Sequence, residues 1–281
     1  MALGIPILSD TTFNNFRALI FEKTGIHMRD GKQILISNRL RRRLAALGLS
    51  TYEEYYDYLT SGAAPADELH NFIDAVSTNE TYFFREANHF NVLHATVLPE
   101  ILSRRKHVSI WSAGCSTGEE PYTLRIVMDE HLGGIPGADA AIVGTDISTA
   151  VIRRARDGVY NERALRFVPP AVLDKYFTPA VDGLRQASPA LRASVSFKVH
   201  NLFKDPPPGE PFDIIFCRNV MIYFDKATQT KLVDEIFSRA LRPDGYLFIG
   251  HSESLSGFSR RFRYAASLKA PIYRLKKEGE P

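Results

Sequence analysis

Beyond residue 107 the chain consists of short, largely apolar runs separated by segments with helical spacing. The runs are VSIWSA, AAIVGTD, SVSFKV, FDIIFC and YLFIG, which begin at residues 108, 140, 194, 212 and 246. Apolar runs of this length predict strands buried on both faces, and helical connections between them are typical of a parallel sheet. This alternation constrains the fold more than any other feature, because it predicts a doubly wound α/β domain.

The first 90 residues follow a different pattern. Phe13, Phe16, Leu19 and Ile20 recur at three- and four-residue spacing, as do apolar residues between positions 34 and 47, and strand-like alternation is missing. A chain of 281 residues is long enough for about two domains. We therefore expect a helical domain with its linker over residues 1–90 and the α/β domain over residues 91–281. Residues 158–195 have weak periodicity and are expected to form an inserted subdomain.

Composition excludes several classes of protein. The chain has 35 basic and 32 acidic side chains, a net charge of +3, and 44% hydrophobic residues, which is typical of a globular protein. No run approaches the roughly 18 apolar residues of a membrane span. Cys115 and Cys217 lie far apart, so neither a disulfide framework nor a metal site is indicated. We expect a cytoplasmic protein, monomeric, without membrane insertion.

Functional residues are expected after each strand, since open α/β sheets bind ligands at the carboxyl ends of their strands. The first run leads into Gly114-Cys115-Ser116-Thr117-Gly118-Glu119-Glu120, a glycine-bearing loop followed by a helix. Its spacing matches neither GxGxxG nor the P-loop, which favours a ligand without phosphate groups. An alternative is purely structural: Thr117 and Glu120 have the spacing of a helix-capping box.

Three further strand ends carry polar side chains. Asp146 follows the second run and could accept both hydroxyl groups of a ribose, or cap the next helix, although Ser148 could cap it equally well. Asn201 with Leu202, and Arg218 with Asn219, follow the next two runs. An asparagine at such a place is often only a turn residue, and an arginine only solvated. Together these positions describe a nucleoside site.

A polar and aromatic cluster, Thr78-Asn79-Glu80-Thr81-Tyr82-Phe83-Phe84-Arg85-Glu86, lies at the join between the two domains. Arg85 could pair with a carboxylate in the cleft between them. The alternative is that the aromatic residues are core packing and that Arg85 is a surface charge.

The strings TNETYFFRE, WSAGCSTGEEPYT, GTDIS and FDIIFCRNVMIYFDK resemble those of the CheR-type chemotaxis receptor methyltransferases, in the same order across nearly the whole chain. The resemblance implies a helical N-terminal domain and a Rossmann-like methyltransferase domain with a small inserted β-subdomain. It also implies transfer of a methyl group from S-adenosylmethionine to glutamate side chains of chemoreceptors. The alternatives are a methyltransferase that acts on RNA or a small molecule, and a non-catalytic binding module of the same fold. The sequence has no stripe of aromatic and basic residues of the kind that binds nucleic acid, so we expect no nucleic-acid partner.

Carried over residue by residue, the resemblance implies that Arg85 and Tyr223 are catalytic. The implied cofactor-binding residues are Asn79, Thr81, Arg85, Gly114, Glu120, Asp146, Asn201, Leu202, Arg218 and Asn219. Glu119 is an alternative to Glu120. A substrate glutamate has a pKa of about 4.3 and is already a carboxylate nucleophile at neutral pH, so no general base is expected.

Residues 17–43 contain eight basic and two acidic side chains, a net charge of +6. A basic helix face suits an acidic partner such as a receptor helix, or it could be merely solvated. The substrate-binding candidates are Arg39, Arg41, Arg42 and Arg43. The stretch from Phe177 to Ser194 is shorter than the β-subdomain of relatives that bind a tethering peptide, so we expect activity without a pentapeptide tether.

Overall fold

The computed structural model describes residues 7–133, 135, 137–209 and 211–277. Its N-terminal part is the predicted helical domain, built from α1 (Asp10–Thr24), α2 (Gln33–Leu47), α3 (Tyr52–Thr60) and α4 (Ala66–Val76). The ends of these helices follow local rules: Thr51 and Glu54 form a capping box on α3, and Gly25 and Gly48 end α1 and α2 in the left-handed conformation. Aromatic side chains from α1, α3 and α4 fill the core of this domain.

The second part contains a seven-stranded sheet with the order β6-β2-β1-β7-β8-β10-β9. The predicted apolar runs are its five parallel strands: β1 (His107–Ala113), β2 (Asp139–Asp146), β6 (Val195–Val199), β7 (Phe212–Cys217) and β8 (Leu241–Ile249). The sheet is mixed, however, because β10 (Ile272–Leu275) pairs antiparallel with β8, and β9 (Phe262–Tyr264) pairs antiparallel with β10. These two antiparallel strands, of which β9 is the edge, were not predicted.

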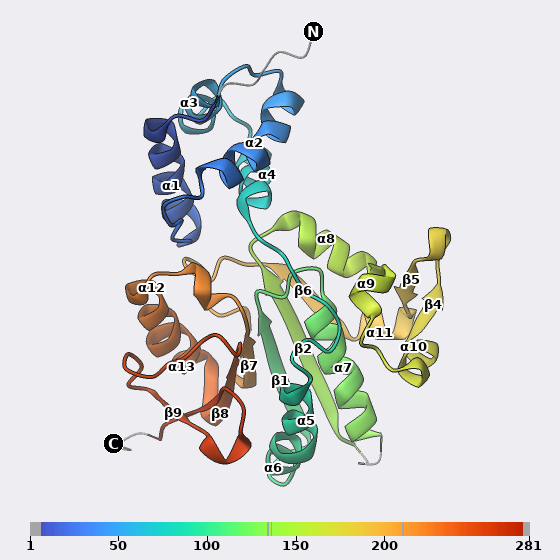
Figure 1. Ribbon diagram of the computed structural model, residues 1–281. Coiled ribbons are helices and arrows are strands. Elements are labelled where there is room, and N and C mark those ends of the chain that lie inside the picture. The colour runs from blue at the N-terminus through green and yellow to red at the C-terminus, as the bar shows by residue number, and fades with distance from the viewer. Residues whose placement is uncertain (1–6, 134, 136, 210, 278–281) are drawn as a thin grey trace.

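Helices cover both faces of the sheet (Figure 1). One face packs against the continuous helical segment α5 (Ala87–Val92), the π-helix η1 (Leu93–Val97) and α6 (Leu98–Leu102), and against α7 (Glu119–Leu132). The other packs against α12 (Lys226–Lys231), the π-helix η4 (Leu232–Phe237) and α13 (Ser238–Ala240). Strand β1 contributes side chains to the hydrophobic cores on both faces of the sheet, with Ile110 on one face and Trp111 on the other. Successive side chains of a strand point to opposite faces, so a strand covered by helices on both faces is apolar on both.

The predicted insertion is a small subdomain after α8 (Thr149–Asp157). Its three strands, β3 (Val159–Tyr160), β4 (Phe177–Pro179) and β5 (Arg185–Ala187), form a separate antiparallel sheet in the order β3-β5-β4. Short helices connect and follow them: α9 (Glu162–Leu165), α10 (Pro170–Tyr176), the 3-10 turn η2 (Val181–Gly183) and α11 (Pro189–Ala193).

The helical domain stands over the carboxyl ends of the parallel strands (Figure 1). Two groups of contacts hold it there. The His27 amide donates to the Tyr223 carbonyl at 2.8 Å, and Ile26 forms an isolated antiparallel bridge with Phe224. On the other side, the Asp74 carboxylate of α4 accepts hydrogen bonds from Thr149 Oγ1 (2.9 Å) and the Ala150 amide (3.2 Å) at the start of α8. Within the described residues, no helix combines the length and apolar character needed to cross a bilayer.

Candidate active site

A cavity of about 810 Å³ lies between the two domains, at the carboxyl ends of β1, β2, β6 and β7. Its lining includes most of the residues that the sequence nominated: Arg39, Asn79, Thr81, Arg85, Gly114, Glu120, Asp146, Asn201, Leu202, Arg218, Asn219 and Tyr223. Residues separated by nearly two hundred positions therefore meet at one place. Arg41, Arg42 and Arg43 do not line it.

The loop after β1 forms part of the cavity wall. The amides of Gly114 and Cys115 both donate to the Thr145 carbonyl at 2.8 Å, which ties this loop to the end of β2. Gly114 has φ +82°, and a Cβ atom there would lie 2.4 Å from Cγ2 of Val220. The position therefore requires glycine both for its backbone conformation and for the close approach of Val220.

The two neighbouring acids of this loop have different roles. No capping box forms, because Gly118 is the N-cap of α7 and the Thr117 hydroxyl donates to the Glu119 carboxylate at 2.7 Å. Glu119 is buried, and burial raises its pKa. Glu120 faces the cavity, where its carboxylate accepts from Ser112 Oγ at 2.7 Å and from Arg218 Nη1 at 3.0 Å. The geometry therefore selects Glu120 as the acid available to a ligand.

Asp146 is buried at the end of β2, with 8% of its surface exposed. Its two oxygens accept from the amides of Ser116 (2.9 Å) and Ser148 (3.0 Å), while Ser148 Oγ caps α8. Burial raises its pKa, and the amide hydrogen bonds oppose that shift. A carboxylate has about four acceptor sites, so Asp146, which lines the cavity, retains acceptor capacity for the hydroxyl groups of a ligand.

Arg218 connects the loop after β7 to two acids. Its side chain is 2% exposed, and its guanidinium pairs with Glu120 at 3.0 Å and with Glu86 at 3.1 Å. It also donates to the carbonyl of Arg85. The neighbouring Asn219 has φ +59°, and its buried Oδ1 accepts no hydrogen bond from any residue the structure describes. An unpaired buried acceptor that lines a cavity is suited to a donor group of a ligand.

Arg85 reaches the cavity from the segment between α4 and α5. The residues on either side of it, Phe84 and Glu86, have positive φ angles of 57° and 58°, a strained conformation that is common at functional sites. Its guanidinium donates to the Glu80 carbonyl at 2.7 Å and lies 5.8 Å from the centre of the Tyr82 ring. Arg85 is thus a cavity-lining cation and not a freely solvated surface charge.

Asn201 is engaged in the structure itself. Its Nδ2 donates to the Lys23 carbonyl at 2.7 Å and its Oδ1 accepts from the Phe203 amide at 3.0 Å. The turn role considered from the sequence is therefore real, and it is combined with a contact to the helical domain. The adjacent Leu202 lines the cavity with 8% of its surface exposed.

The basic residues of α2 divide into three kinds. Arg39 lines the cavity, where it donates to the Val76 carbonyl and to Thr78 Oγ1. Arg41 and Arg42 are exposed, away from the cavity. Arg43 instead pairs with the buried carboxylate of Glu68 on α4, so it is a structural residue of the helical domain. The expectation that it is free to contact a substrate does not agree with this geometry.

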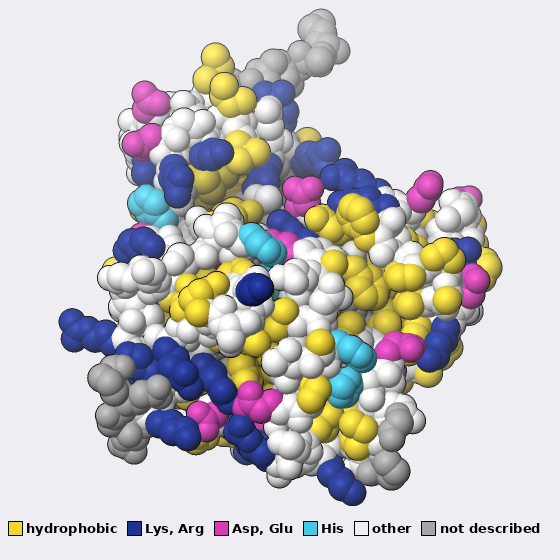
Figure 2. Space-filling model, turned by 60° about the horizontal axis from the view of Figure 1, so that its bottom comes forward, with side chains coloured by type: hydrophobic (Ala, Val, Ile, Leu, Met, Phe, Trp, Pro, Cys, Tyr) yellow, Lys and Arg dark blue, Asp and Glu magenta, His cyan; other side chains and the backbone are white. Residues whose placement is uncertain are grey.

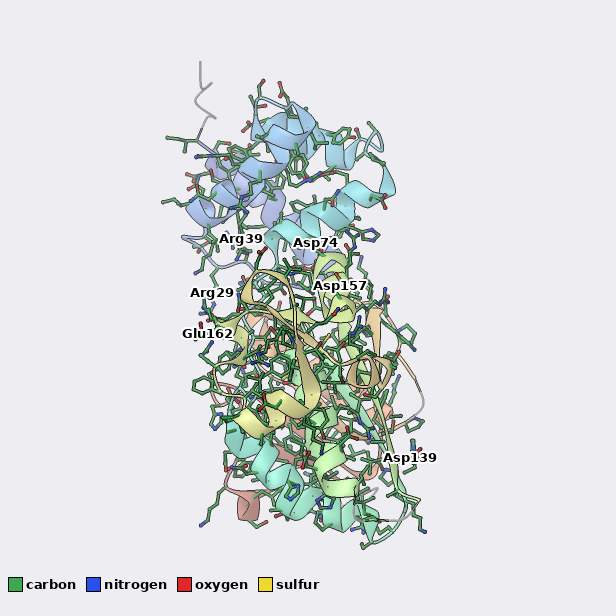
Figure 3. The ribbon with its side chains drawn as sticks, turned by 90° about the vertical axis from the view of Figure 1, so that its right-hand side faces the viewer. Arg29, Arg39, Asp74, Asp139, Asp157 and Glu162 are labelled. Atoms are coloured by element: carbon green, nitrogen blue, oxygen red, sulfur yellow. The ribbon has the colours of Figure 1, made fainter. Side chains whose placement is uncertain are left out.

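Two cavity cations lay within the basic stretch but were not singled out from the sequence. Arg29 and Lys32, in the connection between α1 and α2, line the cavity together with Arg39. Figure 3 shows Arg29 and Arg39 on the same side of the molecule at the junction of the domains. Only the placement of the helical domain over the strand ends shows which of the eight basic residues face the cleft.

Positive charge also gathers on the face turned away from the helical domain, close to the C-terminal end (Figure 2). Several cations at the amino ends of the strands are paired there. Arg104 and Arg274 bind Glu100, Arg105 binds Asp213, and Lys277 lies 3.5 Å from Asp244.

The chain is similar to known proteins over most of its length. The family model described as CheR methyltransferase, all-alpha domain, matches residues 11–77, and the one described as CheR methyltransferase, SAM binding domain, matches residues 79–270. The chemotaxis protein methyltransferase of Salmonella typhimurium is 42% identical over 264 residues, covering 91% of this chain and 88% of the relative. That of Borreliella burgdorferi is 38% identical over 262 residues, covering 91% and 92%. Chemotaxis protein methyltransferase 2 of Pseudomonas aeruginosa is 39% identical over 246 residues, covering 86% of each chain.

Proposed function

The chain belongs to the CheR methyltransferase family, and from this premise we propose that it methylates glutamate side chains of chemoreceptors. It is a methyltransferase that uses S-adenosylmethionine. The proposal concerns the acceptor, a glutamate carboxylate in the cytoplasmic part of a receptor, and the product, a glutamate methyl ester that serves chemosensory adaptation. One observation carries it: the cavity combines a floor of acids and amides with a basic rim supplied by the helical domain.

The residues at the floor fit S-adenosylmethionine. Asp146 has acceptor sites open for the ribose hydroxyls, and Gly114 leaves space that a Cβ would fill. Leu202 supplies apolar surface beside the adenine, and the unpaired Oδ1 of Asn219 can accept from a donor at the methionyl end. Asn79, Thr81, Asn201 and Arg218 complete the lining of this half of the cavity. When bound, the cofactor supplies an electrophilic methyl group on a positively charged sulfur.

Turnover requires little acid–base machinery. The acceptor carboxylate is already ionised, so the chain has to align it with the methyl carbon and remove its water. Arg85, a cation at the cavity wall, is suited to hold the acceptor carboxylate through a charged hydrogen bond. Tyr223 is held by the bond between its carbonyl and the His27 amide and can present its ring to the transferring methyl group.

The helical domain with its linker, residues 1–90, would recognise the substrate, and residues 91–281 would bind the cofactor. Arg29, Lys32 and Arg39 face the cleft, and Arg41 and Arg42 extend the positive surface outside it. A row of cations attracts an acidic receptor helix, and this attraction weakens as the salt concentration rises. We propose further that a single copy of the chain acts, and that it does so without a tethering peptide, since the inserted sheet has strands of only two or three residues. Tight binding of a receptor tail peptide would overturn the last point.

The decisive experiment is transfer of radiolabelled methyl from S-adenosylmethionine to receptor-containing membranes, followed by mild base. We expect label on the receptor that is released as volatile methanol, the signature of a carboxyl methyl ester. Base-stable label would indicate a different acceptor atom. No label, with cofactor binding intact, would favour a binding module without turnover.

A further inference from the structure

Glu86 is partly buried beside the cavity without lining it, and it makes three close contacts with charged or titratable groups. Its Oε2 lies 3.1 Å from Nη2 of Arg218, 2.8 Å from Nδ1 of His251 and 3.2 Å from Nδ1 of His89. The side chain of Glu86 is 17% exposed, and that of His89 is fully buried. Burial alone would raise the pKa of Glu86, but His89, Arg218 and His251 together hold it well below its usual range. Glu86 is therefore an anion at neutral pH.

Glu86 and the two histidines could also be considered as a metal site, because the ligand atoms of Glu86, His89 and His251 lie within 4.8 Å of one another. A cation at that place would face the guanidinium of Arg218, which approaches the same carboxylate oxygen. Buried like charges repel strongly. The arrangement therefore favours a network that serves Arg218 over one that serves a metal ion.

Arg218 lies between two carboxylates, with Glu120 on the cavity side and Glu86 behind it. One guanidinium balances one carboxylate, so the three side chains together carry one surplus negative charge. Burial lowers the pKa of His89, which keeps its imidazole neutral and leaves the surplus in place. A buried charge without a partner is costly, so this charge calls for a cationic group of the ligand at Glu120.

We propose that Glu86 is a positioning residue that, by neutralising Arg218 from behind, keeps the carboxylate of Glu120 available to the ammonium group at the methionyl end of the cofactor. This inference rests on the placement of the cofactor proposed above. Without the charge of Glu86, Arg218 would close on Glu120 as its only anion, and a bidentate pair of that kind would no longer attract an ammonium group.

The test compares two ligands that share the nucleoside and differ at the methionyl end. S-adenosylhomocysteine carries the amino acid portion, whereas 5′-methylthioadenosine lacks both its ammonium and its carboxylate. Calorimetry on the full chain would measure both affinities for the wild type, Glu86→Gln and Glu86→Asp. Glu100→Gln is the matched control, because Glu100 is also partly buried and pairs with two arginines, Arg104 and Arg274, at the far end of the sheet.

We expect Glu86→Gln to weaken S-adenosylhomocysteine about tenfold, with 5′-methylthioadenosine changed less than twofold. Glu86→Asp, which retains the charge, should recover most of the loss, and it keeps the test available if the glutamine variant does not fold. The control should leave both affinities unchanged. Equal weakening of both ligands would mean that Glu86 only maintains the shape of the pocket, and an unchanged affinity for S-adenosylhomocysteine would mean that Glu120 does not need it; either overturns the proposal.

The readout is separate from receptor methylation. If the wild type bound neither nucleoside, the proposed cofactor site and this inference would fail together. If both bound as expected and receptor glutamates were not labelled, only the proposed acceptor would be wrong.

Discussion

Gly114 offers a quantitative test of the cavity wall. Replacing it with alanine has two separate costs. The backbone at φ +82° disfavours any residue with a Cβ by roughly 1–2 kcal/mol. The new Cβ would also lie 2.4 Å from Cγ2 of Val220, and overpacking of this kind costs typically about 1–3 kcal/mol. We therefore expect Gly114→Ala to lower the free energy of unfolding by about 2–5 kcal/mol.

Gly183 provides the matched control. It has φ +72°, and a Cβ there would meet nothing within 4 Å. Gly183→Ala should therefore show the backbone cost alone, roughly 1–2 kcal/mol. The difference between the two variants measures the close approach of Val220. Adding Val220→Ala to Gly114→Ala removes the clashing methyl groups and should cost less than the sum of the two single changes.

Denaturant unfolding with and without S-adenosylhomocysteine would measure these terms. We expect Gly114→Ala also to weaken ligand binding, because the alanine methyl or a displaced Val220 occupies space in the cavity. The reasoning would be refuted if Gly114→Ala cost no more than Gly183→Ala, or if Val220→Ala gave no relief.

Three further predictions concern charged residues. Arg85→Ala should lower turnover about a hundredfold, with cofactor affinity changed less than threefold, since it aligns the acceptor; equal losses of both would make it a binding residue only. Arg41→Glu combined with Arg42→Glu should slow receptor methylation more at low than at high salt, with unchanged cofactor binding; unchanged methylation would exclude this surface. Glu68→Gln should destabilise the protein by about 3 kcal/mol at pH 7, by breaking the buried pair with Arg43. Burial alone would raise the pKa of Glu68, but Arg43, Tyr55 and Asn71 together lower it. Its contribution is therefore present above the unfolded pKa of about 4.3 and is lost as the pH falls through the folded value. The stability difference between wild type and Glu68→Gln, from thermal unfolding, should shrink below pH 4; a constant difference would contradict this.

The sequence predicted the five parallel strands, most of which are buried on both faces, whereas β6 at the edge of the sheet alternates between buried and exposed residues. β7 is buried along its whole length, and five of its six residues are apolar; the exception, Asp213, pairs with Arg105. β9 and β10 have only three and four residues and include Arg263 and Arg274, which lie opposite each other across the ladder. Short strands of this kind give neither a long apolar run nor clear alternation, and only the pairing of β10 with β8 and of β9 with β10 defines them. The strands of the inserted subdomain are also short, with two or three residues each.

The sequence predicted the part of the candidate site that the order of the strands alone brings together. Gly114, Asp146 and Arg218 follow neighbouring parallel strands, so their meeting is a consequence of the sheet. Pairings between helices are not encoded in this way. We expected Arg43 to be free to bind a substrate because its partner Glu68 lies 25 positions away in the sequence. Only the packing of α2 against α4 brings the two side chains together.

The proposed reaction assigns different charges of the cleft to the two domains. Glu120 and Asp146 at the floor suit a cationic cofactor, but the same acids repel an acceptor carboxylate. The acceptor must therefore enter from the opposite side, past cations that the sheet does not supply. Arg29, Lys32 and Arg39 of the helical domain provide them, and the bond from the His27 amide to the Tyr223 carbonyl fixes that domain to the same loop that carries Arg218. In the proposed reaction, methyl transfer to a carboxylate cancels one positive and one negative charge, so a cleft that holds the two charges apart until they align would favour it.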